Sequence, residues 1–276
     1  MDASILELYP ATGISHALEN LYLDQLDNLP GETGSAFIYS NFITSLDGRI
    51  ALPGPDRKTH QVPPAIANAR DWRLFQELAA PADLLITTAR YFRQAADSEA
   101  QAELPVGSSA DFDDLRNWRV ERGMQAQPDI AVFSGSLDIP TSALQHYRDR
   151  RIILLTGQSA DAGKRDALLE QGIDDIITSG PQTRADALNL REELTKRAYR
   201  RVYAIAGPSL LHTLADARAL DRLYLTTAHC LLGGTEFDTF VWGKELQTAL
   251  SLPLCAMYLD REAPKGCGQT MAVYGR

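Results

Sequence analysis

The segment from Arg201 to Gly234 constrains the fold more than any other part of this sequence. An apolar run over 202–206 predicts a buried strand, and Gly207-Pro208 ends it. Proline fits the first turn of a helix, and three leucines at helical spacing follow it. A second apolar run over 223–229 completes a strand–helix–strand unit. Free backbone N–H groups at its glycine turn could hold a phosphate, or the turn could simply connect strand and helix.

Short apolar strands and amphipathic helices alternate along the rest of the chain. Further strands are predicted over residues 36–43, 84–87, 130–133, 152–155, 175–177, 254–260 and 270–274, and helices over 15–26, 63–79, 112–121, 141–150, 161–171 and 184–198. This alternation indicates an α/β fold, in which a doubly wound, largely parallel sheet lies between two helical layers. The last two strands form a hairpin, so the predicted sheet is mixed.

The chain divides unevenly into an arm and a domain. Residues 1–35 are interpreted as an N-terminal helical arm. Residues 36–276 are interpreted as a single domain, because no internal repeat and no low-complexity linker divides them into two. Within the domain, residues 92–128 form an acidic, polar excursion. A polar connection of this length is typical of a lid, a subunit contact or a flexible excursion.

Composition excludes several classes of partner. The net charge of −9 argues against a broad surface for nucleic acid or anionic membrane, although a local basic pocket for a phosphorylated small molecule is compatible with it. No apolar run reaches the ~18 residues of a membrane helix. The first ten residues lack the basic and apolar layout of a secretion signal. We therefore expect a cytoplasmic protein with neither nucleic-acid nor membrane partners.

Metal and hydrolytic chemistry are equally disfavoured. The five histidines are scattered without paired spacing, so no metal site is expected. The three cysteines lie far apart, with no zinc spacing and no disulfide framework, and Cys230 is interpreted as a small buried apolar residue. The sequence contains neither a GxSxG elbow nor a Walker-type phosphate loop.

The ends of the predicted strands share a chemistry. Small, hydroxyl-bearing or glycine residues follow five of the apolar runs, at 44–48, 87–88, 134–136, 156–157 and 206–209. Ligands of doubly wound sheets bind outside the carboxyl ends of the strands, near the point where strand order reverses. The repeated occurrence of such residues at strand ends predicts that a long ligand with phosphates and ribose, namely a dinucleotide, lies across these ends.

Three segments resemble the reductase domain of bacterial riboflavin biosynthesis. They are FITSLDGRIA at 42–51, DWRLFQELAAPADLLI at 71–86 and AGPSLLHTLADARALDRLYLTTAHCLLGG at 206–234. The resemblance follows the family order from Phe37 to Gly234. It implies a dihydrofolate-reductase-like fold, a homodimer, NADPH as cofactor and a phosphorylated small-molecule substrate. The implied activity is that of a 5-amino-6-(5-phosphoribosylamino)uracil reductase, which opens the ribose to ribityl.

The resemblance also implies roles for individual residues. Asp47 would order the substrate or help to move a proton, unless it is only the turn residue of its Asp-Gly pair. The substrate contacts implied are Ser45, Arg49 and Arg70, with Arg57 and Lys58 as further cations, and each cation alone could equally be surface charge. The implied cofactor contacts are Thr44, Thr87, Thr88, Arg90, Thr156, Gly157, Gly207, Pro208, Ser209 and Leu210.

Two loops depart from the family pattern. The family's Glu-Gly-Gly-Pro is Ile205-Ala206-Gly207-Pro208 here, and its Val-Gly-Ala-Gly-Thr is Ile86-Thr87-Thr88-Ala89-Arg90. An acidic residue and several glycines are thereby replaced, and Arg90 could enter the site or capture a phosphate. The sequence leaves two hypotheses open: a reductase with a divergent substrate, or a reductase-like scaffold that has lost catalysis and serves as a binding or interaction module.

Overall fold

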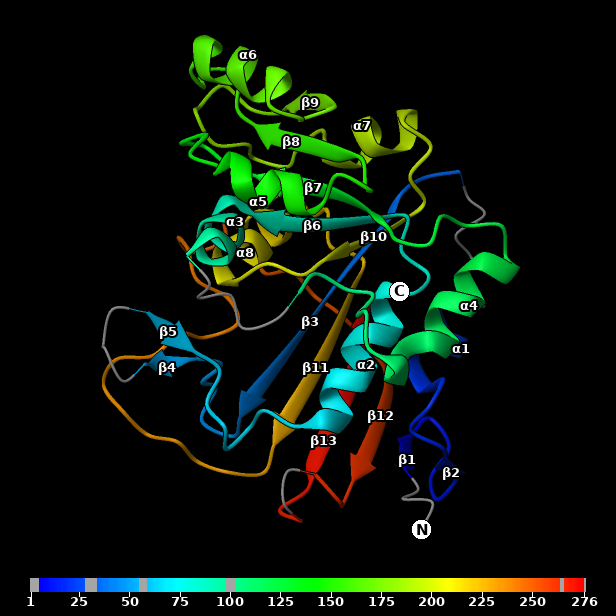
Figure 1. Cartoon of the computed structure of the whole chain (residues 1–276). Coiled ribbons are helices and arrows are strands. Elements are labelled where there is room, and N and C mark those ends of the chain that lie inside the picture. The colour runs from blue at the N-terminus through cyan, green and yellow to red at the C-terminus, as the bar shows by residue number, and fades with distance from the viewer. Residues whose placement is uncertain (1–4, 28–33, 55–58, 98–102, 264–265, 276) are drawn as a thin grey trace.

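Eleven strands form one mixed sheet between two layers of helices (Figure 1) in the computed structural model, which describes residues 5–27, 34–54, 59–97, 103–263 and 266–275. Their spatial order is β2-β1-β12-β13-β11-β3-β10-β6-β7-β8-β9. The strands are β1 (Ile5–Tyr9), β2 (Ser15–His16), β3 (Phe37–Ser45), β6 (Leu84–Thr88), β7 (Asp129–Phe133), β8 (Ile152–Thr156), β9 (Asp175–Thr178), β10 (Arg201–Ala204), β11 (Arg222–Ala228), β12 (Leu254–Asp260) and β13 (Gln269–Gly275).

Seven strands run in parallel and the rest add an antiparallel edge. β3, β6 to β11 pair in parallel, while β13, β12, β1 and β2 continue the sheet beyond β11 in antiparallel pairs. β10 lies between β3 and β6, and β11 lies on the other side of β3, so the order of the sheet reverses around β3 and β10. β4 (Leu52–Pro53) and β5 (His60–Gln61) pair separately. The predicted three-layer, doubly wound mixed sheet is confirmed.

Each face of the sheet carries its own apolar core, because successive strand residues point to opposite faces. Helices α1 (Leu21–Asp27), α2 (Ala69–Ala79), α3 (Ala89–Ala96), α4 (Asp113–Glu121), α5 (Thr141–His146) and α6 (Ala162–Glu170) contribute buried residues to one core. Helices α7 (Leu190–Lys196) and α8 (Pro208–Asp216) cover the other face through buried leucines. Figure 1 shows α2 in front of the part of the sheet that β11, β13 and β12 form.

The beginning of the chain differs from its predicted secondary structure. The helix expected over 15–26 starts only at Leu21, and two strands precede it. β1 joins the central sheet through β12, with Leu6 opposite Leu259. The division into an arm of residues 1–35 and a domain of residues 36–276 stays a prediction.

Two further helices begin later in the chain than predicted. α2 begins at Ala69 rather than at 63, because the Asn68 side chain accepts the Asp71 N–H and caps the helix there. α7 begins at Leu190 rather than at 184, and Asp186 bonds to Ser179 instead of capping that helix. The residues before α7 instead form a loop that lies against the ends of β8 and β9.

The acidic excursion over 92–128 is largely structured where it is described. It contains the end of α3, a 3-10 turn (Ala110–Phe112) and α4, and it buries Leu104, Val106 and Leu115 in the core. Arg119 is 1% exposed, and its guanidinium donates to the carbonyls of Ala80, Ala82 and Gln125. Those carbonyl bonds attach the excursion to the end of α2.

Candidate active site

The turn after β3 is held together by the carboxylate of Asp47. Ser45 Oγ donates to it at 2.5 Å, and the N–H of Gly233 donates at 2.8 Å. The Leu232 N–H lies 3.2 Å from both carboxylate oxygens, and Arg49 Nη1 lies 2.9 Å from Oδ2. The Asp-Gly turn is thereby tied to the segment that follows β11.

These donors set the protonation state of Asp47. The Ser45 hydroxyl and then the Gly233 N–H lower the pKa of the carboxyl to about 2, and burial opposes them only in part. Asp47 is therefore a fixed anion at neutral pH. This suits ordering of a bound group better than the movement of a proton.

Replacing Asp47 tests its structural role. We expect Asp47→Asn to speed hydrogen exchange at the Leu232 and Gly233 amides, because the neutral side chain accepts fewer bonds. The native pKa is depressed, so the stability it contributes is present above about pH 4 and is lost as pH falls toward 2. Hydrogen exchange and acid unfolding of wild type and variant measure both effects. Asp166→Asn, on exposed α6, serves as the control, and equal exchange in all three proteins would contradict the role.

The two arginines predicted to contact substrate already have carboxylate partners. Arg49 pairs with Asp47 and lies over the ring of Phe237, with its guanidinium carbon 4.2 Å from the centroid. Arg70 Nε lies 2.6 Å from Asp260, which is fully buried at the end of β12. Arg57 and Lys58 lie outside the described residues.

The end of β10 presents an exposed glycine at the start of α8. Gly207 is the N-cap, Pro208 is the first helical residue, and a Cβ added to Gly207 would meet nothing within 4 Å. Ser209, at the second helical position, is among the first-turn residues whose N–H groups have no partner within a helix. Leu210 differs from its neighbours because its side chain is 1% exposed and belongs to the core.

The neighbouring β6 ends in two threonines. Thr87 is buried, whereas Thr88 is half-buried and precedes α3 without using its hydroxyl to cap that helix. Arg90 follows on α3 with an exposed side chain, and no carboxylate pairs with it within the described ranges. At the end of β3, the Thr44 hydroxyl donates to the Ser45 and Arg49 carbonyls.

Thr156 and Gly157, at the end of β8, are covered by the chain itself. The hydroxyl of Thr156 and the N–H of Gly157 both donate to the Thr183 carbonyl, at 3.2 and 3.0 Å. A Cβ on Gly157 would lie 1.9 Å from the Gln182 oxygen. Glycine is required here for close approach of residues 182–183, which lie just before the helix predicted over 184–198.

The sheet therefore brings some predicted residues together and keeps others apart. β3, β10 and β6 are adjacent, so the turns beginning at Ser45, Gly207 and Thr87 share one edge. β8 lies four strand positions from β3, or about 19 Å at the usual spacing. We call the ends of β3, β10 and β6 the strand-end site.

One candidate residue, Asp71, was missed from the sequence. It lies in the first turn of α2, and Thr226 of β11 hydrogen-bonds its carboxyl. Burial raises the pKa of Asp71 to about 6, and the Thr226 hydroxyl offsets only part of that rise. Thr226 pairs with Ile43, two residues before the end of β3. Asp71 is thus a carboxylic acid able to exchange a proton near neutral pH.

The sheet surface beside Asp71 is incompletely covered. On the α2 face of β3, Tyr39 is fully buried, but Asn41 and Ile43 are half-buried toward the carboxyl end. Ile205, just after β10, is also half-buried and packs on the same core. The Tyr203 hydroxyl donates to Asn41 Oδ1 at 2.5 Å. A ligand at the strand-end site could reach Asp71 over this surface.

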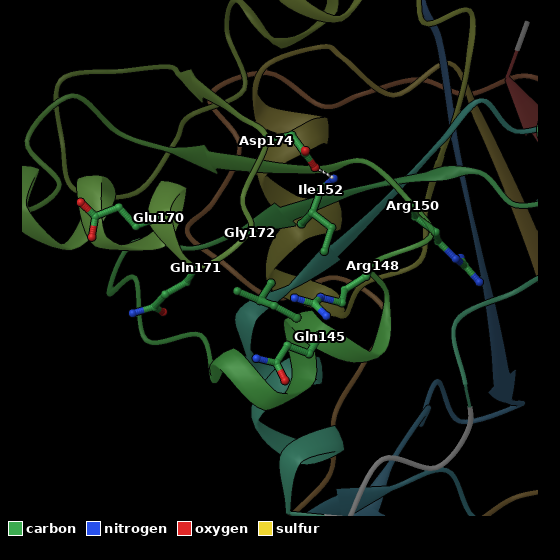
Figure 2. A pocket seen from close by; sticks show the side chains of 9 residues that line it. Gln145, Arg148, Arg150, Ile152, Glu170, Gln171, Gly172 and Asp174 are labelled. Carbon is green, nitrogen blue, oxygen red and sulfur yellow. Dashed lines mark hydrogen bonds between the residues drawn. The ribbon is translucent and has the colours of Figure 1, made fainter.

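A separate pocket lies at the other end of the parallel strands. It measures about 280 Å³ and is lined by residues around the start of β8, including Gln145, Arg148 and Ile152 (Figure 2). Asp174 accepts the Ile152 N–H there at 2.7 Å, and Arg150 is bonded to the Pro105 carbonyl. None of the predicted site residues lines this pocket.

Over the described ranges, no three His, Cys, Asp or Glu side chains gather as a metal site. Within the same ranges, every helix is too short or too polar to span a bilayer.

Comparison with known proteins places this fold among reductases. A pyrimidine reductase-like protein from Corynebacterium diphtheriae is 20% identical, with a TM-score of 0.61 over 87% of this chain and 91% of that one. RibD from Acinetobacter baumannii is 19% identical, with a TM-score of 0.60 over 88% of this chain and 58% of its own. Riboflavin biosynthesis reductase from Saccharomyces cerevisiae is 15% identical, with a TM-score of 0.54 over 93% and 98%. No curated protein sequence matches the chain.

The fold and its strand ends define an α/β protein of the kind seen in these reductases. The chain belongs to the RibD C-terminal domain family, whose model matches residues 36–259. The resemblance noted in the sequence is thereby confirmed at the level of the family.

Proposed function

We propose that this protein is an NADPH-dependent reductase of the riboflavin-biosynthesis type, acting on a phosphorylated small molecule whose identity has diverged. The observation that carries the proposal is that β3, β10 and β6 are adjacent in a member of this family. The exposed Gly207, just after β10, leaves space for a ligand at their shared edge. Homodimer formation and a cytoplasmic location stay predictions of the sequence.

The residues present fit one part of the cofactor better than the other. Gly207 leaves room for a phosphate against the first turn of α8, where the helix dipole favours an anion. Thr88 offers a hydroxyl at the next strand end. Residues 182–183 cover Thr156 and Gly157, so the adenosine half of NADPH would have to bind elsewhere on the protein. NADPH bound at this edge would supply a hydride.

The protein itself would then hold the site in a fixed geometry and supply a proton to the substrate. Asp47, held as an anion, fixes the turn after β3 and through it the segment at Leu232 and Gly233. Reduction with ring opening also requires a proton on the heteroatom that leaves carbon. We assign its delivery to Asp71, because a carboxyl with a pKa near 6 is partly protonated near neutral pH.

Cofactor binding is tested most directly at Gly207. We expect Gly207→Ala to weaken NADPH binding about tenfold, or about 1.4 kcal/mol, because the methyl group occupies the approach to the α8 N-terminus. Stability should barely change, since nothing lies within 4 Å of the added carbon. Calorimetry with NADPH gives the affinity, and Gly163→Ala on α6 is the matched control. Absence of binding to wild type at millimolar NADPH would reject the proposed function.

The covered Thr156–Gly157 end favours one alternative, a reductase-like scaffold that binds without catalysis. The Ala89→Gly and Ala206→Gly double variant, which restores two glycines of the family pattern, separates the two hypotheses. A gain of NADPH binding in the variant, with none in wild type, would support the scaffold. Binding by both proteins would support the reductase.

A further inference from the structure

Two of the three cysteines lie at corresponding positions just beyond the end of one strand pair. β11 and β13 are antiparallel, and their last registered pair is Ala228 with Gln269. The His229 N–H donates to the Gly268 carbonyl at 3.0 Å, which extends the register by one residue. The next residue on each side is a cysteine, Cys230 on one and Cys267 on the other.

The Cα spacing of the ladder next to this position lies within the range of a disulfide. In an antiparallel ladder, a pair next to a hydrogen-bonded pair has Cα atoms about 4.5 Å apart. Disulfides form across Cα separations of about 4.4–6.8 Å. Both chains turn away from the ladder here, since the Cys230 N–H donates to Ala228 at 2.8 Å and Gly266 and Gly268 have positive φ. Neither cysteine is therefore fixed by a further ladder bond.

The two thiols differ in their access to solvent. Cys267 is exposed and Cys230 is half-buried. Burial raises the pKa of Cys230, and the nearby Cys267 thiol and Asp47 raise it further. An oxidant thus meets Cys267 first, and Cys230 acts as the second thiol.

We propose that Cys230 and Cys267 are a reversible dithiol–disulfide pair beside the strand-end site, oxidised by hydrogen peroxide. The Cys267 thiol attacks one oxygen of the peroxide, so an S–O bond forms and the O–O bond breaks. Cys267 becomes a sulfenic acid, and one water is released. Cys230 sulfur then attacks that sulfur, which forms the S–S bond and releases the second water. Two thiols lose two hydrogens in total, and peroxide is reduced to two waters.

The disulfide would act on the segment that holds Asp47. The Cys230 carbonyl accepts the Leu46 N–H at 2.9 Å, and Leu232 and Gly233 donate to Asp47. Oxidation would tether this segment to the turn before β13. The inference concerns cysteine chemistry alone and does not depend on cofactor binding or on turnover.

Peptide mapping tests the pair without any activity assay. Trypsin places the three cysteines in separate peptides: 223–244 with Cys230, 245–261 with Cys255, and 266–276 with Cys267. After peroxide treatment of the native chain, we expect the first and third peptides to be disulfide-linked, with two of the three thiols lost to thiol titration. Dithiothreitol should restore them.

Single serine variants complete the test. Cys255→Ser should leave the linked peptide unchanged, because Cys255 lies apart with its thiol donating to the Gly275 carbonyl. Cys230→Ser should abolish the link and leave Cys267 as a sulfenic acid or its further oxides. In denaturant the preference for the Cys230–Cys267 link should disappear. Retention of all three thiols, a link through Cys255, or disulfide-linked dimers would overturn the proposal.

Discussion

Asp71→Asn is expected to stabilise the protein at pH 7 and to slow its reaction. The pKa of Asp71 is raised from 3.8 to about 6, so the folded state holds its proton more tightly than the unfolded state does. Folding stability therefore falls as pH rises from about 4 through 6. Removing the ionisable group should recover about 2–3 kcal/mol at pH 7, and the gain should vanish below about pH 4. Urea unfolding across this pH range measures it.

The same substitution removes the assigned proton donor. Loss of a general acid typically costs 10²- to 10⁴-fold in rate, so we expect a turnover loss of about that size with NADPH affinity retained. Thr226→Val is the companion variant, because it removes the hydroxyl that lowers the pKa of Asp71. It should move the alkaline limb of the pH–rate profile to higher pH, because a general acid loses activity as the pH rises through its pKa. Full turnover in Asp71→Asn would remove Asp71 from the mechanism, whatever its effect on stability.

Gly157→Ala is expected to destabilise the fold strongly. The added carbon would lie 1.9 Å from the Gln182 oxygen and 2.7 Å from its carbonyl carbon, so the backbone must move. Movement would also strain the bonds from Gln158 to Gly180 and from Ser159 to Gln182, at 2.9 and 3.1 Å. Overpacking and lost hydrogen bonds together suggest a loss of about 2–4 kcal/mol. Equilibrium unfolding in urea checks this value.

Comparison among glycines keeps this prediction specific. Gly163→Ala places the new carbon at ordinary contact, 3.4 Å from Asp161, and should stabilise α6 by up to about 1 kcal/mol. Gly207→Ala should be near neutral in stability. Equal unfolding free energies for all three variants would contradict the idea that Gly157 is a packing glycine.

Local patterns predicted the parts of the fold that local forces determine. The β10–α8–β11 unit was predicted almost to the residue, because an apolar run, Pro208 at the helix start and leucines at helical spacing all agree. β1 was missed because its five residues become a strand only through pairing with β12, near the other end of the chain. α7 was predicted too long because the loop before it is held in place: Thr183 contacts the end of β8, and Asp186 bonds to Ser179 just after β9.

The surroundings of individual site residues depend on contacts between distant parts of the chain, so local patterns could not predict them. Asp71 looks from sequence like an ordinary acid in a first helical turn, and only the packing of α2 on β11 raises its pKa. Gly157 was predicted to contact the cofactor, but the backbone of Gln182 and Thr183 packs against it. Cys230 and Cys267 are 37 positions apart in the sequence, and only the β11–β13 register brings them together.

The insertion of β10 between β3 and β6 has a consequence for how the protein folds. β10 pairs Arg201 with Phe37 on one side and Val202 with Leu84 on the other. Neither β3 nor β6 can pair with β10 until the chain has been synthesised as far as β10. Contacts separated so widely in sequence form late and slowly. On the ribosome the strand-end site therefore assembles late, and a chain stopped before residue 201 would leave β3 without either neighbour and β6 with one unpaired edge.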